Sequence, residues 1–426
     1  MGATGSGKST LLRSATGLAS ALPGTGVTGS FSTNARATGY VPQDALDGFL
    51  SFDAVNEFVL RLRALGRSLP EAHQEAQRRL TVIQLAERAT VPLHRLSGGE
   101  RRRLALAAAQ VHDPDVLLLD EPFNHVDSAW RPRLAIDIGR AALRRLVVVA
   151  THDPSPWQED SPRTLLIRDG RLHHDGPADG FDPARFPEIA IGPTAPWNTS
   201  PRAATPRLEF QAVTCELEGT RALEEVTLDL GPGLHALVGP NGAGKTTFLR
   251  AAAGLIRPQS GRIRANGLDT RAATGLVHHV ALQFEEPTSA FFASTLRQEL
   301  AFAPTNQGLP GCDIEARLRE AISDFELDAF MDRHPYTLSG GQKQRLALAS
   351  VQATQAPIIL LDEPTQGLDA ANRRLLHAFL ERQATDRCIV AATHDEGLIG
   401  LAHDVTRLCA GRIEAAPREV TLRTPS

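Results

Sequence analysis

An internal repeat constrains the fold of this 426-residue chain more than any other feature of its sequence. "LSGGERRRLALAAA" begins at Leu96, and "LSGGQKQRLALASV" begins at Leu338. After each of them come a strand-like block, "VLLLDEP" or "IILLDEP", and then a third block, "VVVATHD" or "IVAATHD". The two copies of every block lie 242 residues apart, so no net insertion separates the blocks. The repeat therefore predicts two copies of one domain, which account for the length of the chain.

A phosphate-binding loop precedes the repeated blocks in each copy. Residues 2–9 and 239–246 match the pattern G-x-x-x-x-G-K-[ST], and a helical segment follows each, "STLLRSATGL" or "TTFLRAAAGL". In such a loop the backbone N–H groups bind phosphates, the lysine adds positive charge and the hydroxyl reaches Mg²⁺. We expect nucleotide phosphates to bind these residues: Gly2, Gly5, Gly7, Lys8, Ser9 and Thr10 in the first copy, and Gly239, Asn241, Gly242, Gly244, Lys245, Thr246 and Thr247 in the second.

Lysine is rare in this chain, and its positions support the two loops. Only Lys8, Lys245 and Lys343 occur among 45 basic residues, and the first two stand in the loop patterns. A compact ammonium group fits inside a loop of backbone N–H groups, whereas a planar guanidinium is too wide. Lysine is kept where arginine would not work, which favours functional loops over chance matches.

Two acidic residues follow the apolar run of the second block in each copy. Four apolar residues in a row are typical of a parallel strand buried on both faces, and its C-terminal end lies beside the phosphate loop. We expect Asp120 and Asp362 to hold Mg²⁺, and Glu121 and Glu363 to orient and polarise the attacking water. The alternative is that these acids only cap the next turn, and the repeated order of blocks argues against it.

The LSGG segment predicts a second anion site in each copy. A serine N-cap, two glycines with exposed N–H groups and an outward helix dipole favour a negative charge. Taken alone, the segment is equally typical of a well-capped helix without a ligand. The residues concerned are Ser97, Gly98 and Gly99 in the first copy, and Ser339, Gly340 and Gly341 in the second.

This combination of blocks resembles the ATP-binding-cassette (ABC) ATPases over essentially the whole chain apart from a linker. The resemblance implies an α/β fold with two tandem P-loop NTPase domains, each a mainly parallel sheet flanked by helices plus a helical subdomain with the LSGG segment. It also implies that the cassettes pair head to tail, so that each site for ATP and Mg²⁺ combines the phosphate loop of one with the LSGG segment of the other. His152 and His394 match the family's switch histidine, and Asp127 and Asp369 match its interface loop.

The copies differ at the position where the family has a coupling glutamine. "GYVPQD" places Gln43 there in the first copy, and the same separation of 242 residues leads to Glu285 in the second. Gln283 lies two residues earlier, and a single-residue bulge would bring it into that place instead. We therefore count Gln43 and Glu285 among the ATP-binding residues, keep Gln283 as the alternative, and expect two sites with unequal turnover.

The domain boundaries follow from the repeat and from a proline-rich stretch between the copies. We expect a first cassette at 1–180, an extended linker at 181–206 and a second cassette at 207–426. The first copy lacks the counterpart of Arg207–Val238, the segment that leads into the second phosphate loop. We therefore expect the first domain to lack its N-terminal strands, and the natural protein to begin about 30 residues upstream, because a central strand is costly to remove.

Composition excludes several classes of function. A net charge of -4, with both signs interspersed, argues against a nucleic-acid binder, which usually carries a concentrated basic surface. No stretch approaches the roughly 20 apolar residues that span a bilayer. We therefore expect no nucleic-acid partner, and any membrane-spanning subunit to be a separate chain.

Two classes of function fit such a chain. One is the ATPase subunit of a membrane importer. The other is a soluble tandem cassette protein acting on the ribosome, which "EPFNHVD" favours but the proline-rich linker does not, since that class typically has a long, charged helical linker.

Two segments, "LQFEEPTSAFFASTLRQELAFAP" and "HPYTLSGGQKQRLALAS", resemble the energy-coupling-factor cassettes that drive uptake of vitamins and of cobalt or nickel. This resemblance implies an ATP-hydrolysing subunit, peripheral at the cytoplasmic face of the cell membrane. Its partners would be a transmembrane scaffold and a substrate-binding membrane protein. Phe291 and Phe292 would suit a contact surface for such a partner, or they belong to the core.

Overall fold

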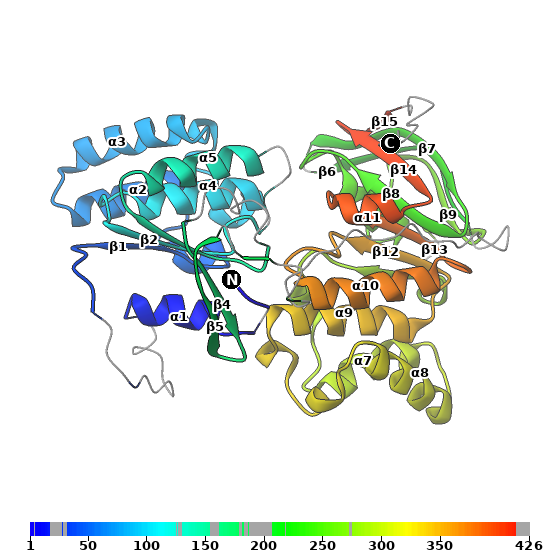
Figure 1. The fold of residues 1–426 in the computed structure, drawn as a ribbon. Helices are drawn as coiled ribbons and strands as arrows, with labels where there is room; N and C mark the ends of the chain where they lie inside the picture. The colour runs from blue at the N-terminus through cyan, green and yellow to red at the C-terminus, as the bar shows by residue number, and fades with distance from the viewer. Residues whose placement is uncertain are drawn as a thin grey trace, which may run out of the picture. The chain divides into compact units, whose positions relative to one another are not determined.

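The computed structural model describes residues 1–3, 5–17, 28, 32–124, 126, 130–153, 162–178, 181–182, 186, 207–217, 219–271 and 275–414. The chain divides into two compact units, Met1–Ile191 and Gly192–Ser426 (Figure 1). Asp127 and most of the stretch 181–206 lie outside the described residues, so the linker stays a prediction. Among the residues described, no helix is both long enough and apolar enough to span a bilayer.

The second unit contains a six-stranded sheet in the order β11-β12-β13-β8-β14-β15. Its first five strands in this order are parallel to their neighbours, and β15 is antiparallel to β14. All residues of β8 are buried, because strands flank it on both edges and apolar side chains cover both faces. The strands are β8 (Gly233–Val238), β11 (Val280–Gln283), β12 (Ile358–Asp362), β13 (Cys388–Ala392), β14 (Asp404–Cys409) and β15 (Arg412–Glu414).

An antiparallel sheet and a helical subdomain complete the second unit. The sheet has the order β10-β9-β6-β7, and its strands are β6 (Leu208–Leu217), β7 (Thr220–Leu230), β9 (Ser260–Ala265) and β10 (Leu268–Asp269). Helices α7 and α8 pack against α9, which carries the LSGG segment at its N-terminus (Figure 1). The helices are α6 (Lys245–Ala252), α7 (Leu296–Asn306), α8 (Gly311–Asp324), α9 (Gly340–Thr354), α10 (Ala370–Gln383) and α11 (Glu396–Leu401).

The first unit repeats this arrangement in part. Strands β1, β2 and β3 form a parallel sheet in this order, and β4 and β5 form an antiparallel pair. Helices α2 to α4 share one apolar core, as α7 to α9 do. The elements are α1 (Lys8–Ala15), β1 (Thr38–Val41), α2 (Ala54–Ala64), α3 (Leu69–Val82), α4 (Gly98–Ala109), β2 (Val116–Asp120), α5 (Arg131–Ala142), β3 (Leu146–Ala150), β4 (Thr164–Arg168) and β5 (Arg171–Gly176).

The two units differ in one central strand of their sheets. In the described part of the first unit no strand lies between β3 and β4, whereas β8 lies between β13 and β14 in the second. This matches the expectation that the first domain lacks its N-terminal strands. The exposure of β3 follows from it: Leu146 is 62 % exposed, while the equivalent Cys388 on β13 is 0 % exposed. Among the described residues, β3 therefore has a neighbouring strand on one edge only.

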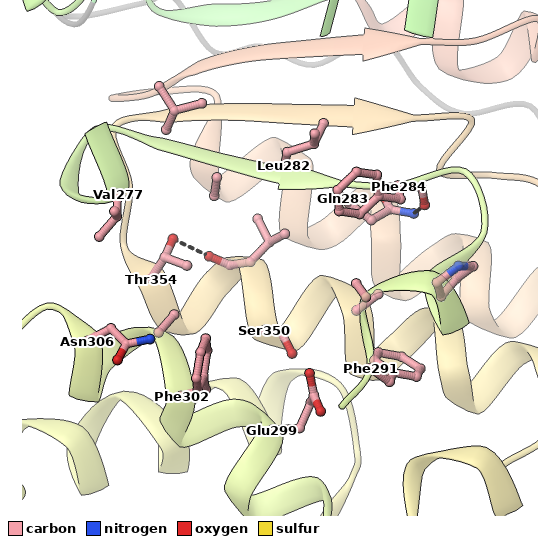
Figure 2. Close-up of a pocket in the computed structure, with 17 residues that line it drawn as sticks. Val277, Leu282, Gln283, Phe284, Phe291, Glu299, Phe302, Asn306, Ser350 and Thr354 are labelled. Carbon is pink, nitrogen blue, oxygen red and sulfur yellow. Dashed lines mark hydrogen bonds between the residues drawn. The ribbon is translucent and has the colours of Figure 1, made fainter. Parts of the chain in front are cut away.

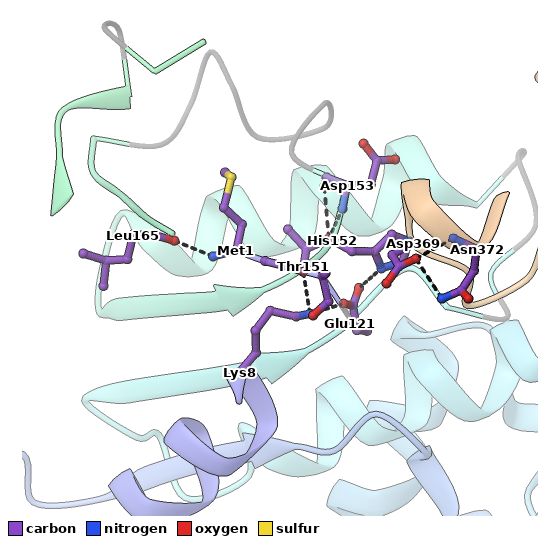
Figure 3. A network of polar contacts seen from close by, with 11 residues as sticks. Met1, Lys8, Glu121, Thr151, His152, Asp153, Leu165, Asp369 and Asn372 are labelled. Carbon is purple, nitrogen blue, oxygen red and sulfur yellow. Dashed lines mark hydrogen bonds and ion pairs between the residues drawn. The ribbon is translucent and has the colours of Figure 1, made fainter. Parts of the chain in front are cut away.

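The first two residues lie in the place of this strand. The Met1 amino group donates to the Leu165 carbonyl at 2.6 Å, and the Met1 carbonyl accepts from the Ile167 N–H at 2.9 Å (Figure 3). On the other side, the Gly2 N–H donates to the Thr151 carbonyl at 3.3 Å. The first phosphate loop therefore starts between β3 and the β4 hairpin, as the second starts at the end of β8.

The open edge of β3 makes a prediction about local stability. Amide hydrogen exchange should be at least about tenfold faster for residues 146–150 than for 388–392, because β2 is the only strand that pairs with β3 among the residues described. Mass spectrometry of peptides from both strands measures the two rates in one sample. Equal protection of the two strands would contradict this account of the first unit.

Candidate active sites

Each phosphate loop ends in a glycine whose backbone conformation allows the next helix to begin. Gly7 and Gly244 precede α1 and α6 with the same dihedral angles, φ 104° and ψ 8°. A side chain would strain this left-handed conformation, which explains glycine at both positions. The N–H groups of the first helical turn have no partner within the helix, so the two loops have the local geometry of an anion site.

Both loop lysines are buried and contact their own loops. Lys8 Nζ donates to the carbonyls of residues 2 and 3 at 2.6 and 2.9 Å, and Lys245 Nζ donates to those of residues 239 and 240 at 2.8 and 3.2 Å. Lys8 is 7 % exposed and Lys245 is 8 % exposed. Phosphate oxygens are stronger acceptors than these neutral carbonyls, so we expect the lysines to change partners when a nucleotide binds, which stays a prediction.

The glutamates after β2 and β12 have a strained backbone. Glu121 and Glu363 both have φ 47°, which is uncommon for a residue with a side chain. Each N–H donates at 2.8 Å to the neighbouring strand, to the carbonyl of Ala150 in the first unit and of Ala392 in the second. Strain of this kind persists only where the surroundings impose it, and it is concentrated at functional sites.

A histidine contacts each glutamate. His152 Nδ1 lies 3.0 Å from Glu121 Oε2, and His394 Nδ1 lies 2.8 Å from Glu363 Oε2. Lys8 Nζ is 3.6 Å from the other Glu121 oxygen (Figure 3). Burial raises the pKa of Glu121, but His152 and then Lys8 lower it by more, so its net shift is downward. The structure thus brings together the predicted loop lysine, glutamate and histidine of the first unit.

The carboxylates that end β2 and β12 fit a divalent cation. Asp120 is 0 % exposed, and in the described part of the chain its oxygens lack a hydrogen bond of good geometry, although the Ser9 hydroxyl is close enough to lower its pKa. Burial raises the pKa of Asp120. A buried carboxylate next to a loop hydroxyl suits Mg²⁺, which takes oxygen ligands and is bound through one or two carboxylates plus phosphates.

The second unit carries one more negative charge at this place. Burial raises the pKa of Asp362 to about 6, a hydrogen bond from Thr246 opposes the rise, and the charges of Glu285 and Glu363 add to it. Glu285 is therefore close enough to Asp362 for their charges to interact. A cation bound between them would relieve this repulsion.

The LSGG serines are N-caps, as predicted. Ser97 Oγ accepts from the Glu100 N–H at 3.3 Å, and the Glu100 carboxylate accepts from the Ser97 N–H at 2.8 Å. Ser339 and Gln342 make the same reciprocal pair at 3.4 and 2.9 Å. This capping box fixes the start of α4 and α9 and leaves the glycine N–H groups directed out of the helix end. That these ends bind ATP stays a prediction.

The register of β1 and β11 bears on the glutamine position. Val41 lies opposite Leu119, and Gln283 lies opposite the equivalent Leu361. Gln283 therefore stands where the first unit has a valine, and Glu285 stands where it has Gln43. Gln283 is also buried, and its amide donates to the Phe284 carbonyl at 3.2 Å. The register favours Glu285, and its contact with ATP stays a prediction.

One buried acid in each unit was not identified from the sequence. The Glu57 carboxylate accepts from the N–H groups of residues 50 and 51, and Glu299 accepts from those of residues 292 and 293. The four distances lie between 2.7 and 3.1 Å. A glutamate repeated at a separation of 242 residues within an apolar helix is the signal that could have found this pair.

Comparisons with known proteins show which family this chain resembles. A family model described as ABC transporter matches residues 1–124 and 223–366. Relatives named "Putative ABC transporter ATP-binding protein" include one from Methanosarcina mazei, 30% identical over 89% of this chain and 78% of its own length, and one from Streptomyces avermitilis, 30% identical over 100% and 90%. The solved structure of cbiO1 from Clostridium perfringens, described as part of the ABC transporter complex cbiONQ, is 26% identical with a TM-score of 0.44, covering 49% of this chain and 86% of that chain.

The family match extends over more than half of the chain, in one segment of each unit. This chain therefore belongs to the ABC transporter family. It is an ABC ATPase with two ATP-binding cassettes of the P-loop fold.

The raised pKa of Asp362 predicts a pH dependence of stability. Because the folded state binds this proton more tightly than the unfolded chain does, the contribution is fully present below about pH 4 and is lost as the pH rises through about 6. The shift from 3.8 to about 6 corresponds to about 3 kcal/mol at neutral pH. Asp362→Asn should therefore stabilise the nucleotide-free protein in EDTA, increasingly so as the pH rises, in urea unfolding that reports the second unit.

The control is Asp332→Asn, which removes an exposed carboxylate of the same unit. A gain of stability that does not depend on pH, or one that the control shares, would contradict the assignment to Asp362.

Proposed function

We propose that this chain is the ATP-hydrolysing subunit of a membrane importer of the energy-coupling-factor type, for a vitamin or a transition metal such as cobalt or nickel. Its partners would be a transmembrane scaffold and a substrate-binding membrane protein, and it would lie at the cytoplasmic face of the membrane. One observation carries the proposal. In each unit, the segment after the glutamine position exposes large apolar side chains.

In the second unit this segment borders an apolar cavity of about 350 Å³. The cavity lies between β11 and the helices α7 and α9 (Figure 2). Leu282, Phe291 and Phe302 contribute apolar walls, and Glu299 and Gln283 contribute the polar ones. A mainly apolar recess with few polar groups suits the apolar face of a partner's helix.

The two phenylalanines of this segment differ in their surroundings. Phe291 is 7 % exposed and belongs to the core of the helical subdomain. Phe292 is 60 % exposed and packs edge-on against Phe302, with ring centroids 4.3 Å apart. Of the predicted pair, Phe292 therefore supports a contact surface, and Phe291 is a core residue.

The first unit exposes apolar side chains in the same segment. Leu50 is 67 % exposed and Phe52 is 90 % exposed, while Glu57 fixes the backbone between them. Single apolar residues on a surface are ordinary, but a pre-ordered apolar segment at the same place in both units is typical of a binding surface. A membrane partner with two similar helices would cover both.

The chemistry proposed for each site follows from its own residues. Glu121 or Glu363 would accept the proton of the water that attacks the γ-phosphate, and His152 or His394 would hold that carboxylate in place. Ser9 with Asp120, and Thr246 with Asp362, would hold Mg²⁺, which neutralises phosphate charge when bound. The LSGG segments would complete the sites head to tail, and ATP binding would then close the cassettes.

The proposal predicts what this protein recovers from native membranes in mild detergent. Wild-type protein should recover a small polytopic scaffold together with one or more substrate-binding membrane proteins. The double variant Phe52→Asp, Phe292→Asp should reduce this recovery about tenfold or more, because it places charges in the apolar contact. Quantitative mass spectrometry of the recovered proteins measures both.

A matched control is Leu143→Asp, which changes another strongly exposed leucine outside this segment. It should leave the recovery unchanged. Stoichiometric recovery of ribosomal proteins would favour the ribosome-acting alternative and overturn the importer proposal. Full recovery of the scaffold by the double variant would instead exclude the apolar segments as its contact.

A further inference from the structure

A buried arginine in the first unit contacts the loop that carries Gln43. Arg102 lies on α4, one turn after the LSGG segment, and is only 2 % exposed. Its Nη1 donates to the Pro42 carbonyl at 2.7 Å, and its Nη2 donates to the Gln43 carbonyl at 2.6 Å. One guanidinium thus joins two consecutive carbonyls to a helix about 60 residues away in sequence.

The second unit has a different arrangement at this place. The residue equivalent to Arg102 is Gln344, whose amide donates to the Pro364 carbonyl at 3.1 Å, after the end of β12. A more distant part of the loop is held instead by Tyr336, whose hydroxyl donates to the carbonyls of Thr288 and Phe291 at 3.1 and 3.4 Å. The equivalent of Tyr336 in the first unit is His94. The first unit therefore holds its loop by a residue of the LSGG helix, whereas the second holds its loop by a residue of the turn that precedes this helix.

The position of Arg102 links the loop to the acidic end of β2. Burial lowers the pKa of Arg102 to about 10, and the charges of Asp44, Asp120 and Glu121 oppose this, so the side chain is charged at neutral pH. A buried charge requires acceptors that remain in place, and the two carbonyls supply them. Moving the loop away from α4 would leave this charge without its acceptors, so the contact resists such a movement.

We propose that Arg102 is a positioning residue, which fixes the backbone of Pro42 and Gln43 to α4 so that the Gln43 side chain is set for the nucleotide of the first unit. The expected effect on catalysis rests on the proposed function of that site. The contact between Arg102 and the loop does not. It makes the Gln43 loop and the LSGG helix of the first unit one rigid body. In the second unit, Glu285 and α9 lack this particular connection.

The test is Arg102→Gln, which gives the first unit the residue that the second unit already accommodates. It is made with Glu363→Gln, so that turnover reports the first site. Amide exchange of residues 42–51 should rise about tenfold, while that of residues 116–120 stays unchanged. The kcat should fall about tenfold, and the KM for ATP should change less than about twofold. The reason is that a misplaced Gln43 side chain affects the geometry of the reaction more than the affinity for the nucleotide.

Arg103→Gln is the matched control. Arg103 stands next to Arg102 on α4, but it donates to the Ile83 carbonyl, outside the Gln43 loop. It should change neither the exchange of residues 42–51 nor the kcat. In a Gln43→Ala background the further effect of Arg102→Gln on kcat should disappear, since Arg102 acts through Gln43. Additive effects in that background would overturn the positioning role.

Unchanged protection of residues 42–51 in Arg102→Gln would overturn the inference at once. If this variant does not fold, Gln344→Arg provides the reverse test in the second unit. It should increase the protection of residues 284–287 from amide exchange. Unchanged protection there would also overturn the inference. A third outcome is possible: Arg102→Gln speeds the exchange of residues 42–51, but the protein without this substitution hydrolyses no ATP. That result would support the contact of Arg102 with the loop and contradict the proposed function. The two failures are thus distinguishable.

Discussion

Each site depends on one backbone hydrogen bond between neighbouring strands. The N–H of Glu121 or Glu363 donates to Ala150 or Ala392, and this bond holds the glutamate in its left-handed conformation. The histidine that contacts the carboxylate follows two residues after that alanine. Parallel pairing of β2 with β3, and of β12 with β13, therefore positions the glutamate, its histidine and the buried aspartate together.

The two sites share this frame and differ in the charges around it. In the first, Lys8 lies close to the glutamate, and the loop with Gln43 is bound to a buried arginine. In the second, Glu285 adds a negative charge near Asp362, whose pKa is raised as a result of burial and of this charge. A closed site with little water increases such effects, so the extra carboxylate should slow attack on a phosphate that is itself negative.

The sequence predicts most of the fold and the site, because both depend on short repeated patterns. The loop glycines, the capped LSGG helices and the acidic strand ends lie where local rules place them. Arg102 and Glu57 were missed, since a charged side chain on a helix normally faces solvent and only tertiary packing shows its acceptors. The same reason explains why Phe291 and Phe292 could not be told apart.

The most direct test of this account compares ATP turnover of the second site with and without Glu285. With Glu121→Gln silencing the first site, adding Glu285→Gln should raise the rate, because it removes a charge that repels the γ-phosphate. The reciprocal change, Gln43→Glu with Glu363→Gln, should lower the rate of the first site. A rate that is unchanged or lower in the Glu285→Gln variant would contradict the account and make Gln283 the better candidate.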